Sequence, residues 1–143
     1  MNKIVGFIFP VPPGLVERLL VENRNVFVKY LARNGVKIAP KYKVLFYMSH
    51  SSKEIVGEGQ IEEIQFLTPD EVLVKYGTKV FLNRGELTKY MLRQPKRNAS
   101  KKMLVLVLSK LKRYTKPIRY KQPISMAGQY LWEEDYLELL KQQ

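Results

Sequence analysis

KKMLVLVLSKLKRY, residues 101–114, places six consecutive apolar residues, Met103 to Leu108, between clusters of lysine and arginine. A run this short and this rich in Val and Leu predicts a strand that is buried on both faces. It is too brief for a typical helix and far too brief to span a membrane. We therefore expect this run to be a central strand of the fold, with its basic ends on the surface.

The basic ends of this strand belong to a larger basic window, Leu87 to Trp132. The window contains twelve Lys or Arg and no Asp or Glu. The whole chain has 25 basic and 13 acidic residues, so the surplus of +12 is confined to one third of the sequence. Such a surplus attracts polyanions, because each neutralised phosphate releases condensed counterions. Nucleic acid, anionic lipid and acidic protein are all candidate partners, and a lysine-rich surface adapted to solubility or to heat, as in a thermophilic protein, is the alternative.

Length and composition limit the class of protein. A chain of 143 residues, 45% of them apolar, is long enough for one folded domain, which we expect to span residues 1–143. The chain has no Cys and one His, so no disulfide, metal site or other cofactor is expected. The apolar segment 1–11 lacks a cleavage pattern, which favours a first strand over a signal peptide. We expect a soluble, cytoplasmic protein without membrane segments.

Alternating apolar residues predict strands along the first half of the chain. The strands are expected at residues 4–9, 25–32, 42–48 and 54–66. A helix at 12–22 begins at prolines, which suit the first helical turn, and has the spacing of an amphipathic helix. The last two strands form a hairpin, in which Gly57 and Gly59 mark a bend where the sheet curls towards a barrel.

Two short helices have strong start signals. Thr68 and Asn83 can each cap a helix, and Glu71 and Glu86 stand three residues later, where a capping-box carboxylate reaches back to the backbone. Gly77 is expected to end the first of these helices. A last helix is expected at 133–141. Its buried stripe is predicted to consist of Trp132, Tyr136, Leu139 and Leu140.

Two features follow the central strand. Pro117 and Pro123 each precede an isoleucine, a pattern that suits an edge strand. Gly128 permits a close approach of two backbone segments. We therefore expect an edge strand, followed by a turn into the last helix with Tyr130 in the core; the alternative is that Gln129 and Tyr130 line a cleft.

The order and spacing of these features resemble the PUA-like superfamily and, within it, the ASCH-type domains of an archaeal branch. The resemblance rests on the proline-started helix and its following strand, the hairpin, the capped helix pair and the central strand. The residues concerned are 12–31, Lys43–Ser49, Ile55–Ile64, Thr68–Gly77, Asn83–Met91 and 103–118. The resemblance implies an α+β fold, a small curled mixed β-barrel of about six strands with helices packed around it. It also implies a cleft that in many relatives accepts RNA or a single, often modified, nucleobase.

The resemblance also raises an enzymatic alternative. Some ASCH-type relatives hydrolyse an amide of an acetylated cytidine with a Lys, a Thr and a Glu, of which the first two lie just after the first helix. The corresponding segment here, 22–29, has no Thr and offers only Arg24 or Lys29, which argues against that activity. A nucleoside or RNA hydrolase of ASCH type stays the alternative function. Its candidate residues are Lys29 or Arg24, Glu58 or Glu86, and Tyr47.

The end of the basic window is the stronger candidate for a nucleic-acid-binding surface. Cations alternate there with aromatic rings, and single-stranded RNA recognition combines cations on phosphates with rings that stack on unpaired bases. The candidate residues are Lys110, Lys112, Arg113, Tyr114, Lys116, Arg119 and Lys121. The alternative is that Tyr114 and Tyr120 are partly buried at the barrel rim and that the lysines form a solvated face.

A second group of candidates begins after the first helix. It consists of Arg24, Asn25, Lys29, Tyr47 and Gln129. In the resembling fold the strand after the first helix faces the cleft, where Asn could read a base edge and Arg or Lys could bind a phosphate. The alternative is that Asn25 shapes a turn and that Lys29 extends from a strand edge into solvent.

Together these observations favour a non-catalytic RNA-binding module. It would grip phosphates through the basic window and hold one base in a cleft. RNA or a nucleotide is the expected partner, and neither a membrane nor a metal is expected. An adaptor that docks on an acidic protein or on the ribosome is a further alternative.

Overall fold

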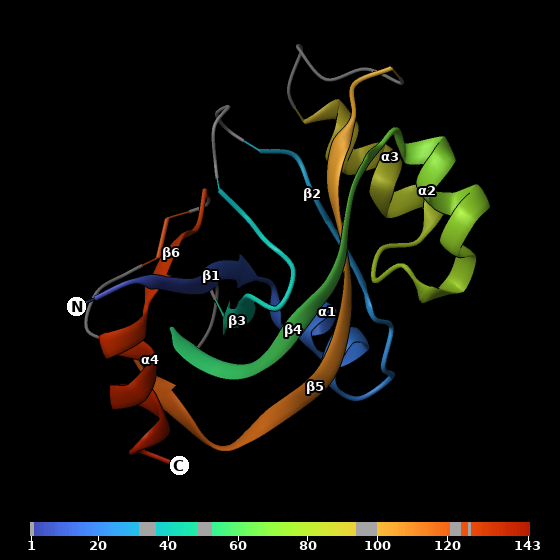
Figure 1. Cartoon of the computed structure of the whole chain (residues 1–143). Helices are drawn as coiled ribbons and strands as arrows, with labels where there is room; N and C mark the ends of the chain where they lie inside the picture. Colours follow the sequence, from blue (N-terminus) through green and yellow to red (C-terminus); the bar gives the residue numbers. More distant parts are fainter. Residues whose placement is uncertain (1, 32–36, 49–52, 94–99, 121–123, 126) are drawn as a thin grey trace.

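The computed structural model describes residues 2–31, 37–48, 53–93, 100–120, 124–125 and 127–143. Within them, six strands form one sheet in the order β2-β5-β4-β3-β1-β6 (Figure 1). The strands are β1 (Ile4–Val11), β2 (Val26–Lys29), β3 (Lys43–Met48), β4 (Glu54–Leu67), β5 (Met103–Arg119) and β6 (Gln129–Trp132). The helices are α1 (Pro13–Leu20), α2 (Pro69–Tyr76), α3 (Arg84–Leu92) and α4 (Glu133–Leu140), with a 3₁₀ turn, η1, at Gly77–Lys79.

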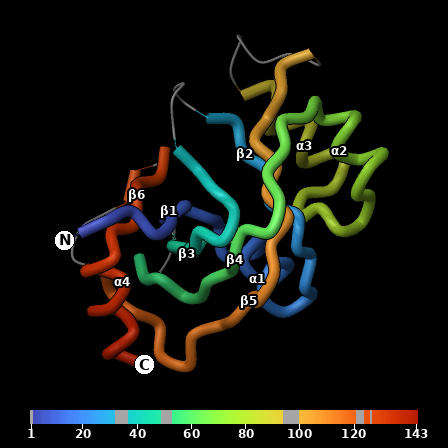
Figure 2. The backbone as a smooth tube through the Cα atoms, in the orientation of Figure 1, coloured from blue at the N-terminus to red at the C-terminus, as the bar shows by residue number. Residues whose placement is uncertain are grey.

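The sheet is mixed and open. β1 runs parallel to β3, and the other neighbouring strands are antiparallel. β2 and β6 are the two edges, and no ladder joins them in the part of the chain that the structure describes. The predicted α+β class with six strands is confirmed, but the predicted barrel is a curled sheet that does not close (Figure 2). The edge strands have only four residues each; β2 pairs with β5, and β6 pairs with β1.

β4 and β5 form a long antiparallel ribbon that carries the rest of the sheet. β5 has 17 residues and β4 has 14, and the two pair along their whole length. Three shifts of register bend this ribbon, and Lys110, at one of them, has a φ of 53°. At the predicted bend, a Cβ on Gly57 would lie 2.6 Å from the Leu20 side chain and 2.6 Å from the Lys112 carbonyl. Glycine is therefore needed at this position for α1 to pack against the ribbon.

The two halves of β5 have different surroundings. Residues Met103–Leu108 lie between β4 and β2, and five of these six side chains are buried, which confirms the predicted central strand. Residues 109–119 pair with β4 alone within the described residues. This second half is an edge, where Pro117 can be accommodated because no further strand requires its missing N–H.

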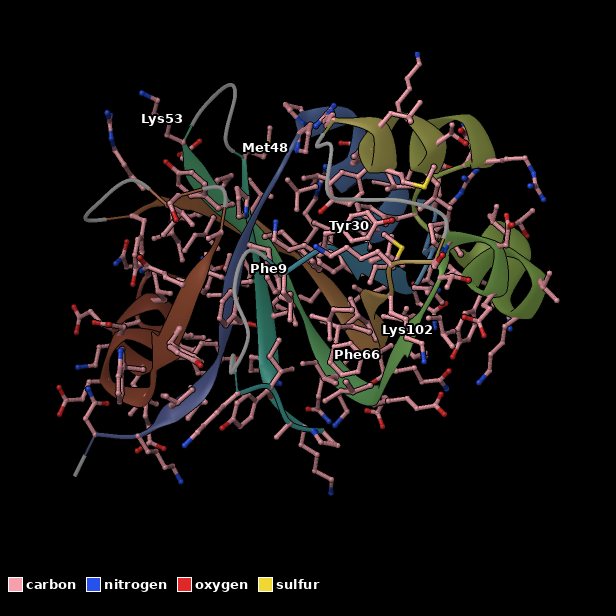
Figure 3. The ribbon with its side chains drawn as sticks, turned by 90° about the horizontal axis from the view of Figure 1, so that it is seen from above. Phe9, Tyr30, Met48, Lys53, Phe66 and Lys102 are labelled. Atoms are coloured by element: carbon pink, nitrogen blue, oxygen red, sulfur yellow. The ribbon has the colours of Figure 1, made fainter. Side chains whose placement is uncertain are left out.

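Aromatic rings fill the interior of the curled sheet. The ring of Phe27, from β2, stacks on that of Phe9, from β1, at 5.1 Å and on that of Phe81 at 4.9 Å between centroids. Phe46 of β3 lies 6.2 Å from Phe27. Such pairs contribute about 0.5–1.5 kcal/mol each beyond the burial of their surface. The rings therefore connect distant strands through the interior, and Figure 3 places Phe9 near the centre of the molecule.

A second, smaller core uses the opposite faces of β1 and β3. Phe9 and Phe46 belong to the main core, whereas Ile8 and Leu45, their neighbours along each strand, belong to the second one. α4 covers this second core through Leu139, which is buried. The predicted stripe of α4 is wrong in part. Trp132 and Leu140 are 40% and 38% exposed, because only one side of this short helix faces the sheet.

Both predicted capping boxes are present. Thr68 and Asn83 accept the backbone N–H groups of Glu71 and Glu86, whose carboxylates accept the backbone N–H groups of the two capping residues in return. α2 ends at Gly77, as predicted, with a φ of 54° that suits glycine. A cap of this kind stabilises a helix by about 1 kcal/mol, which fixes where α3 starts.

Candidate functional site

A cavity of about 220 Å³ opens between the end of β1, the start of α1, β2 and α3. β1 ends at Val11, and the carbonyl of Pro12 accepts the backbone N–H groups of Leu15 and Val16, so the chain turns directly into α1. The wall is mostly apolar. Its apolar residues are Pro10, Val11, Pro12, Leu15, Phe27, Val28, Phe81 and Leu82. The stacked pair Phe27–Phe81 from the main core thus forms part of the cavity wall.

One face of α3 supplies the polar side of the cavity. Glu86, Lys89, Tyr90 and Arg93 all line it, and their spacing of three, four and seven residues places them on one helical face. The Tyr90 hydroxyl accepts the backbone N–H of Tyr30 at 2.9 Å, and the two rings lie 5.2 Å apart. Tyr90 is therefore held in place at the cavity wall.

Lys29 adds a further cation to the cavity, and Lys101 lies beside Tyr30, whose ring packs against Tyr90. Lys29, at the end of β2, lines the cavity, and its ammonium lies 5.5 Å from the centroid of the Phe9 ring. The ammonium of Lys101 lies 5.9 Å from the centroid of the Tyr30 ring. We use the name cavity rim for the three cations that line the cavity, Lys29, Lys89 and Arg93.

Among the residues that the structure describes, Glu86 is the one carboxylate that lines this cavity. It accepts hydrogen bonds from the Arg18 guanidinium of α1 and, at 2.9 Å, from the backbone N–H of Asn83. Arg18 is itself fixed, because it also donates to the Phe81 carbonyl at 3.0 Å. The hydrogen bond from Arg18 is the main reason why the pKa of Glu86 lies below its ordinary value. The cavity therefore contains a positioned, ionised hydrogen-bond acceptor.

The predicted cations of β5 lie elsewhere, along its edge half. We call this segment, residues 109–119, the β5 arm; Figure 1 shows β5 running from the side of α3 to the side of α4. Its exposed cations are Lys110, Lys112, Arg113, Lys116 and Arg119. Arg113 forms an ion pair with Glu17 of α1. Lys121 lies outside the described residues. Lysine and proline on a free strand edge also protect it from pairing with other chains, which explains this composition without a ligand.

The aromatic ring predicted to stack from the arm is buried. Tyr114 is 3% exposed, and its hydroxyl donates to Glu58 at 2.8 Å. Tyr136 of α4 donates to both oxygens of Glu58, at 3.0 and 2.9 Å, and the Lys43 ammonium lies 3.6 Å from it. Burial and the neighbouring carboxylate raise the pKa of both tyrosines above the ordinary value. This Glu58 cluster ties β5 and α4 to β4, and Tyr114 is more deeply buried than the partly buried rim position that the alternative interpretation gave it.

A second cavity, of about 390 Å³, lies beside the β5 arm. Of the described residues that line it, Arg113 and Glu54 are charged and Tyr114 is aromatic. Because Arg113 is paired with Glu17 and the Tyr114 hydroxyl is bound to Glu58, the groups that could bind a ligand there are already engaged. This cavity is the weaker candidate.

The structure does not bring the second group of predicted site residues together. Of that group, Lys29 lines the first cavity. Arg24 forms an ion pair with Glu22 at 3.2 Å. Asn25 donates its amide to the Leu108 carbonyl at 3.1 Å and so extends the pairing of β2 with β5.

The other two members of that group lie in different places. Tyr47 is 4% exposed and belongs to the second core. Gln129, in β6, donates to the Tyr120 hydroxyl at 3.4 Å. The predicted close approach of two backbone segments at Gly128 is present, since a Cβ there would lie 2.7 Å from the Ile8 carbonyl oxygen.

Sequence reasoning missed Lys89, Tyr90 and Arg93 as residues of a common site. The signal that could have found them is the spacing of Glu86, Lys89, Tyr90 and Arg93 on a helix whose start is fixed by its cap. The apolar half of the cavity carries no comparable signal, because it comes from β1, α1, β2 and the segment before α3.

Within residues 2–31, 37–48, 53–93, 100–120, 124–125 and 127–143, no group of three or more His, Cys, Asp or Glu side chains could hold a metal ion. Over the same ranges, no helix is both long enough and apolar enough to cross a membrane. The chemistry of the first cavity therefore rests on aromatic rings, three cations and one carboxylate.

Sequence comparison identifies the family. Residues 4–133 match the family described as "Domain of unknown function (DUF365)". An uncharacterized protein from Methanocaldococcus jannaschii is 31% identical over 105 residues, which represent 69% of this chain and 97% of that protein.

Structural comparison identifies the fold. The ASCH protein from Zymomonas mobilis superposes with a TM-score of 0.76 at 16% identity, over 96% of this chain and 94% of that one. Its serine-to-alanine variant gives a TM-score of 0.79 at 16% identity, over 99% of both chains. The N-terminal domain of Staphylothermus marinus McrB gives 0.58 at 17% identity, over 100% of this chain and 99% of that one. The chain therefore belongs to the DUF365 family, and it has the fold of the ASCH domains.

Proposed function

We propose that this protein is a nucleic-acid-binding module that holds single-stranded RNA at the first cavity. One unpaired base enters the cavity, and the phosphates on either side of it contact the cavity rim, Lys29, Lys89 and Arg93. The module acts by binding, without chemistry on the RNA.

One observation carries this proposal: aromatic residues and three cations line the same cavity. Proteins that bind single strands combine cations on the backbone with rings that stack on bases. Tyr90, which is half-buried at the cavity wall, supplies such a ring, whereas Phe27 and Phe81 are buried core rings that make part of the wall apolar. The volume of about 220 Å³ is below the usual range for drug-sized ligands, roughly 300–1,000 Å³, and suits a single base better than a whole nucleotide. A base inside a duplex could not enter it.

The fold gives independent support at a coarser level. The resemblance to PUA-like proteins implies a cleft that accepts RNA or one nucleobase. The net charge of +12 favours a polyanionic partner. The fold and the net charge are compatible with RNA binding at the cavity or at the β5 arm. The test therefore has to distinguish between these two surfaces.

The test measures the affinity of the protein for a labelled single-stranded RNA by fluorescence anisotropy. The Lys89→Ala/Arg93→Ala double variant removes two cations from the cavity rim. The Lys112→Ala/Lys116→Ala double variant removes the same charge from the β5 arm, from exposed positions. We expect the first variant to bind at least about tenfold more weakly, because it loses two charged contacts, and the second to bind within about twofold of the original protein.

Two outcomes would overturn the proposal. One is that the original protein does not bind RNA at moderate salt. The other is that the arm variant loses as much affinity as the rim variant, or more. A single-stranded DNA and a duplex RNA of the same length serve as competitors, and the duplex is expected to compete poorly.

A hydrolase is the second candidate function, because Lys29 and Glu86 line one cavity, as that alternative requires. Two observations weigh against it. The lowered pKa of Glu86 makes it a weak base, and Tyr47 and Glu58 lie in the second core and the Glu58 cluster, away from this cavity. Incubation with acylated nucleosides and with RNA should give no product above a heat-denatured control. Product formation that Lys29→Ala abolishes would establish the hydrolase instead.

A further inference from the structure

We infer that the first cavity selects the base it holds through Glu86, and that it prefers a base with an amino group, adenine, cytosine or guanine, over uracil. This inference rests on the proposed function. It adds a specificity-determining residue to a site whose cations would otherwise bind any RNA sequence equally, since phosphate contacts carry no sequence information.

Glu86 meets the geometric requirement for reading a base. It lies on the same face of α3 as Tyr90, Lys89 and Arg93, so a base that enters along the ring of Tyr90 meets the carboxylate beside it. Its side chain is 33% exposed, which leaves part of it accessible to a ligand.

The environment of Glu86 makes it an acceptor only. Its Oε1 atom accepts the guanidinium of Arg18 and the backbone N–H of Asn83. Both interactions favour the ionised carboxylate, which has acceptor sites and no donor. Among the described residues, no hydrogen bond to its Oε2 atom is present, so this oxygen is the one that a ligand would meet.

The four bases differ in what they present to such an oxygen. Adenine, cytosine and guanine each carry an exocyclic amine that can donate to it. Uracil has no amine, and its single N–H donor lies between two carbonyl oxygens, which an ionised carboxylate repels. A base in the cavity would cover the exposed part of Glu86, and an acceptor that is covered without a donor costs about 1–3 kcal/mol, which corresponds to a preference of about fivefold or more for the amino bases.

The test uses four oligouridylates of equal length that differ only at one central position, which is uridine, cytidine, adenosine or guanosine. Affinities are measured by fluorescence anisotropy at one salt concentration. We expect the original protein to bind the three amino-base oligonucleotides about fivefold or more tightly than the all-uridine one.

Glu86→Gln is the informative variant. Glutamine also serves in a capping box, so α3 keeps its start, but the amide presents a donor as well as an acceptor. We expect the preference for amino bases to fall to about twofold or less, while binding of the all-uridine oligonucleotide is kept or improved. Glu71→Gln is the matched control, because Glu71 has the same capping role in α2 and does not line the cavity. Its base preference should equal that of the original protein.

The inference is overturned if the original protein binds all four oligonucleotides equally, or if Glu86→Gln keeps the full preference. These results differ from a failure of the proposed function. If the proposed function fails, no oligonucleotide binds, or the affinity is unchanged when Lys89 and Arg93 are replaced by alanine. Base-indifferent binding that still requires the cavity rim would refute the selection by Glu86 alone.

Discussion

The cavity rim and the β5 arm are both basic, yet they differ in what surrounds their charges. Lys29, Lys89 and Arg93 line a cavity together with aromatic rings. The cations of the arm stand along a free strand edge, and the ring expected to accompany them, Tyr114, is buried against Glu58. Charge density alone therefore does not locate a binding site. The site is better indicated by cations that share a concave surface with groups able to contact a base.

The arm has a structural explanation that the rim lacks. An exposed strand edge invites pairing with other chains, and lysine and proline on it prevent such pairing. Arg113 is tied to Glu17, and Lys110 lies near Glu62, whose pKa is lowered first by the Ser109 hydroxyl and further by Lys110. If this contrast is correct, changes in the Glu58 cluster should affect stability, changes of the arm cations should leave RNA binding nearly unchanged, and changes at the cavity should weaken RNA binding.

The largest effect expected from this contrast is on stability, in the Glu58 cluster beside the arm. Glu58→Ala leaves two tyrosine hydroxyls and the Lys43 ammonium without their common partner in a nearly buried site. We expect the free energy of unfolding, measured with urea, to fall by about 3 kcal/mol. The affinity for RNA below the unfolding transition should stay within about twofold of the original value. A loss of RNA binding in the folded variant would mean that the arm takes part in recognition.

The second effect concerns stacking at the cavity. Tyr90→Ala removes a ring from the cavity wall and should weaken RNA binding by about 1–3 kcal/mol, the usual range for one stacked base. Tyr90→Phe keeps the ring, so this variant should lose much less RNA-binding affinity than Tyr90→Ala. Tyr114→Phe serves as the counterpart in the arm and should leave the affinity unchanged. Equal losses for Tyr90→Ala and Tyr114→Phe would remove the distinction between the two regions.

A smaller effect is expected at alkaline pH. The pKa values of Tyr114 and Tyr136 are raised in the folded protein, so both hydroxyls must ionise more readily once the chain unfolds. Their contribution to stability is complete below the ordinary tyrosine pKa of about 10 and declines as the pH rises above it. Urea unfolding between pH 8 and pH 11 should show this decline. In Tyr114→Phe/Tyr136→Phe the decline should be shallower, and an unchanged profile would contradict the role of the Glu58 cluster.

The smallest effect is predicted for the arm lysines themselves. Lys112→Ala/Lys116→Ala should leave both the free energy of unfolding and the affinity for RNA nearly unchanged, because exposed charges of this kind contribute little to either in the absence of a partner. Light scattering after prolonged incubation is the informative measurement for this variant. Increased association between chains would support the protective role of these lysines at the strand edge.

Much of the fold could be predicted because its signals are local. The apolar run Met103–Leu108 identified the central strand, and Thr68 and Asn83 with their following glutamates identified the starts of α2 and α3. The bend at Gly57 was predictable because glycine inside a strand usually marks such a place. The family resemblance then gave the correct six-stranded α+β arrangement.

The site was less predictable, because sequence does not say which way a side chain faces after an irregularity. The register shift beside Lys110 interrupts the alternation of β5, so the faces of the residues beyond it could not be inferred from spacing. Tyr47 and Tyr114 were predicted to contact a base because each lies beside polar or basic residues in the sequence. Both side chains are buried in the core. The cavity itself combines β1, α1, β2 and α3, which only tertiary structure brings together.

The most direct test of the contrast between the two regions is the salt dependence of RNA binding. The slope of log Kobs against log salt concentration is measured for the original protein, Lys89→Ala/Arg93→Ala and Lys112→Ala/Lys116→Ala on the same oligonucleotide. For single strands each phosphate contact contributes about 0.7 to this slope, so the rim variant should reduce its magnitude by about 1.4 and the arm variant should leave it unchanged. A slope that the arm variant reduces and the rim variant preserves would contradict the assignment of RNA binding to the cavity.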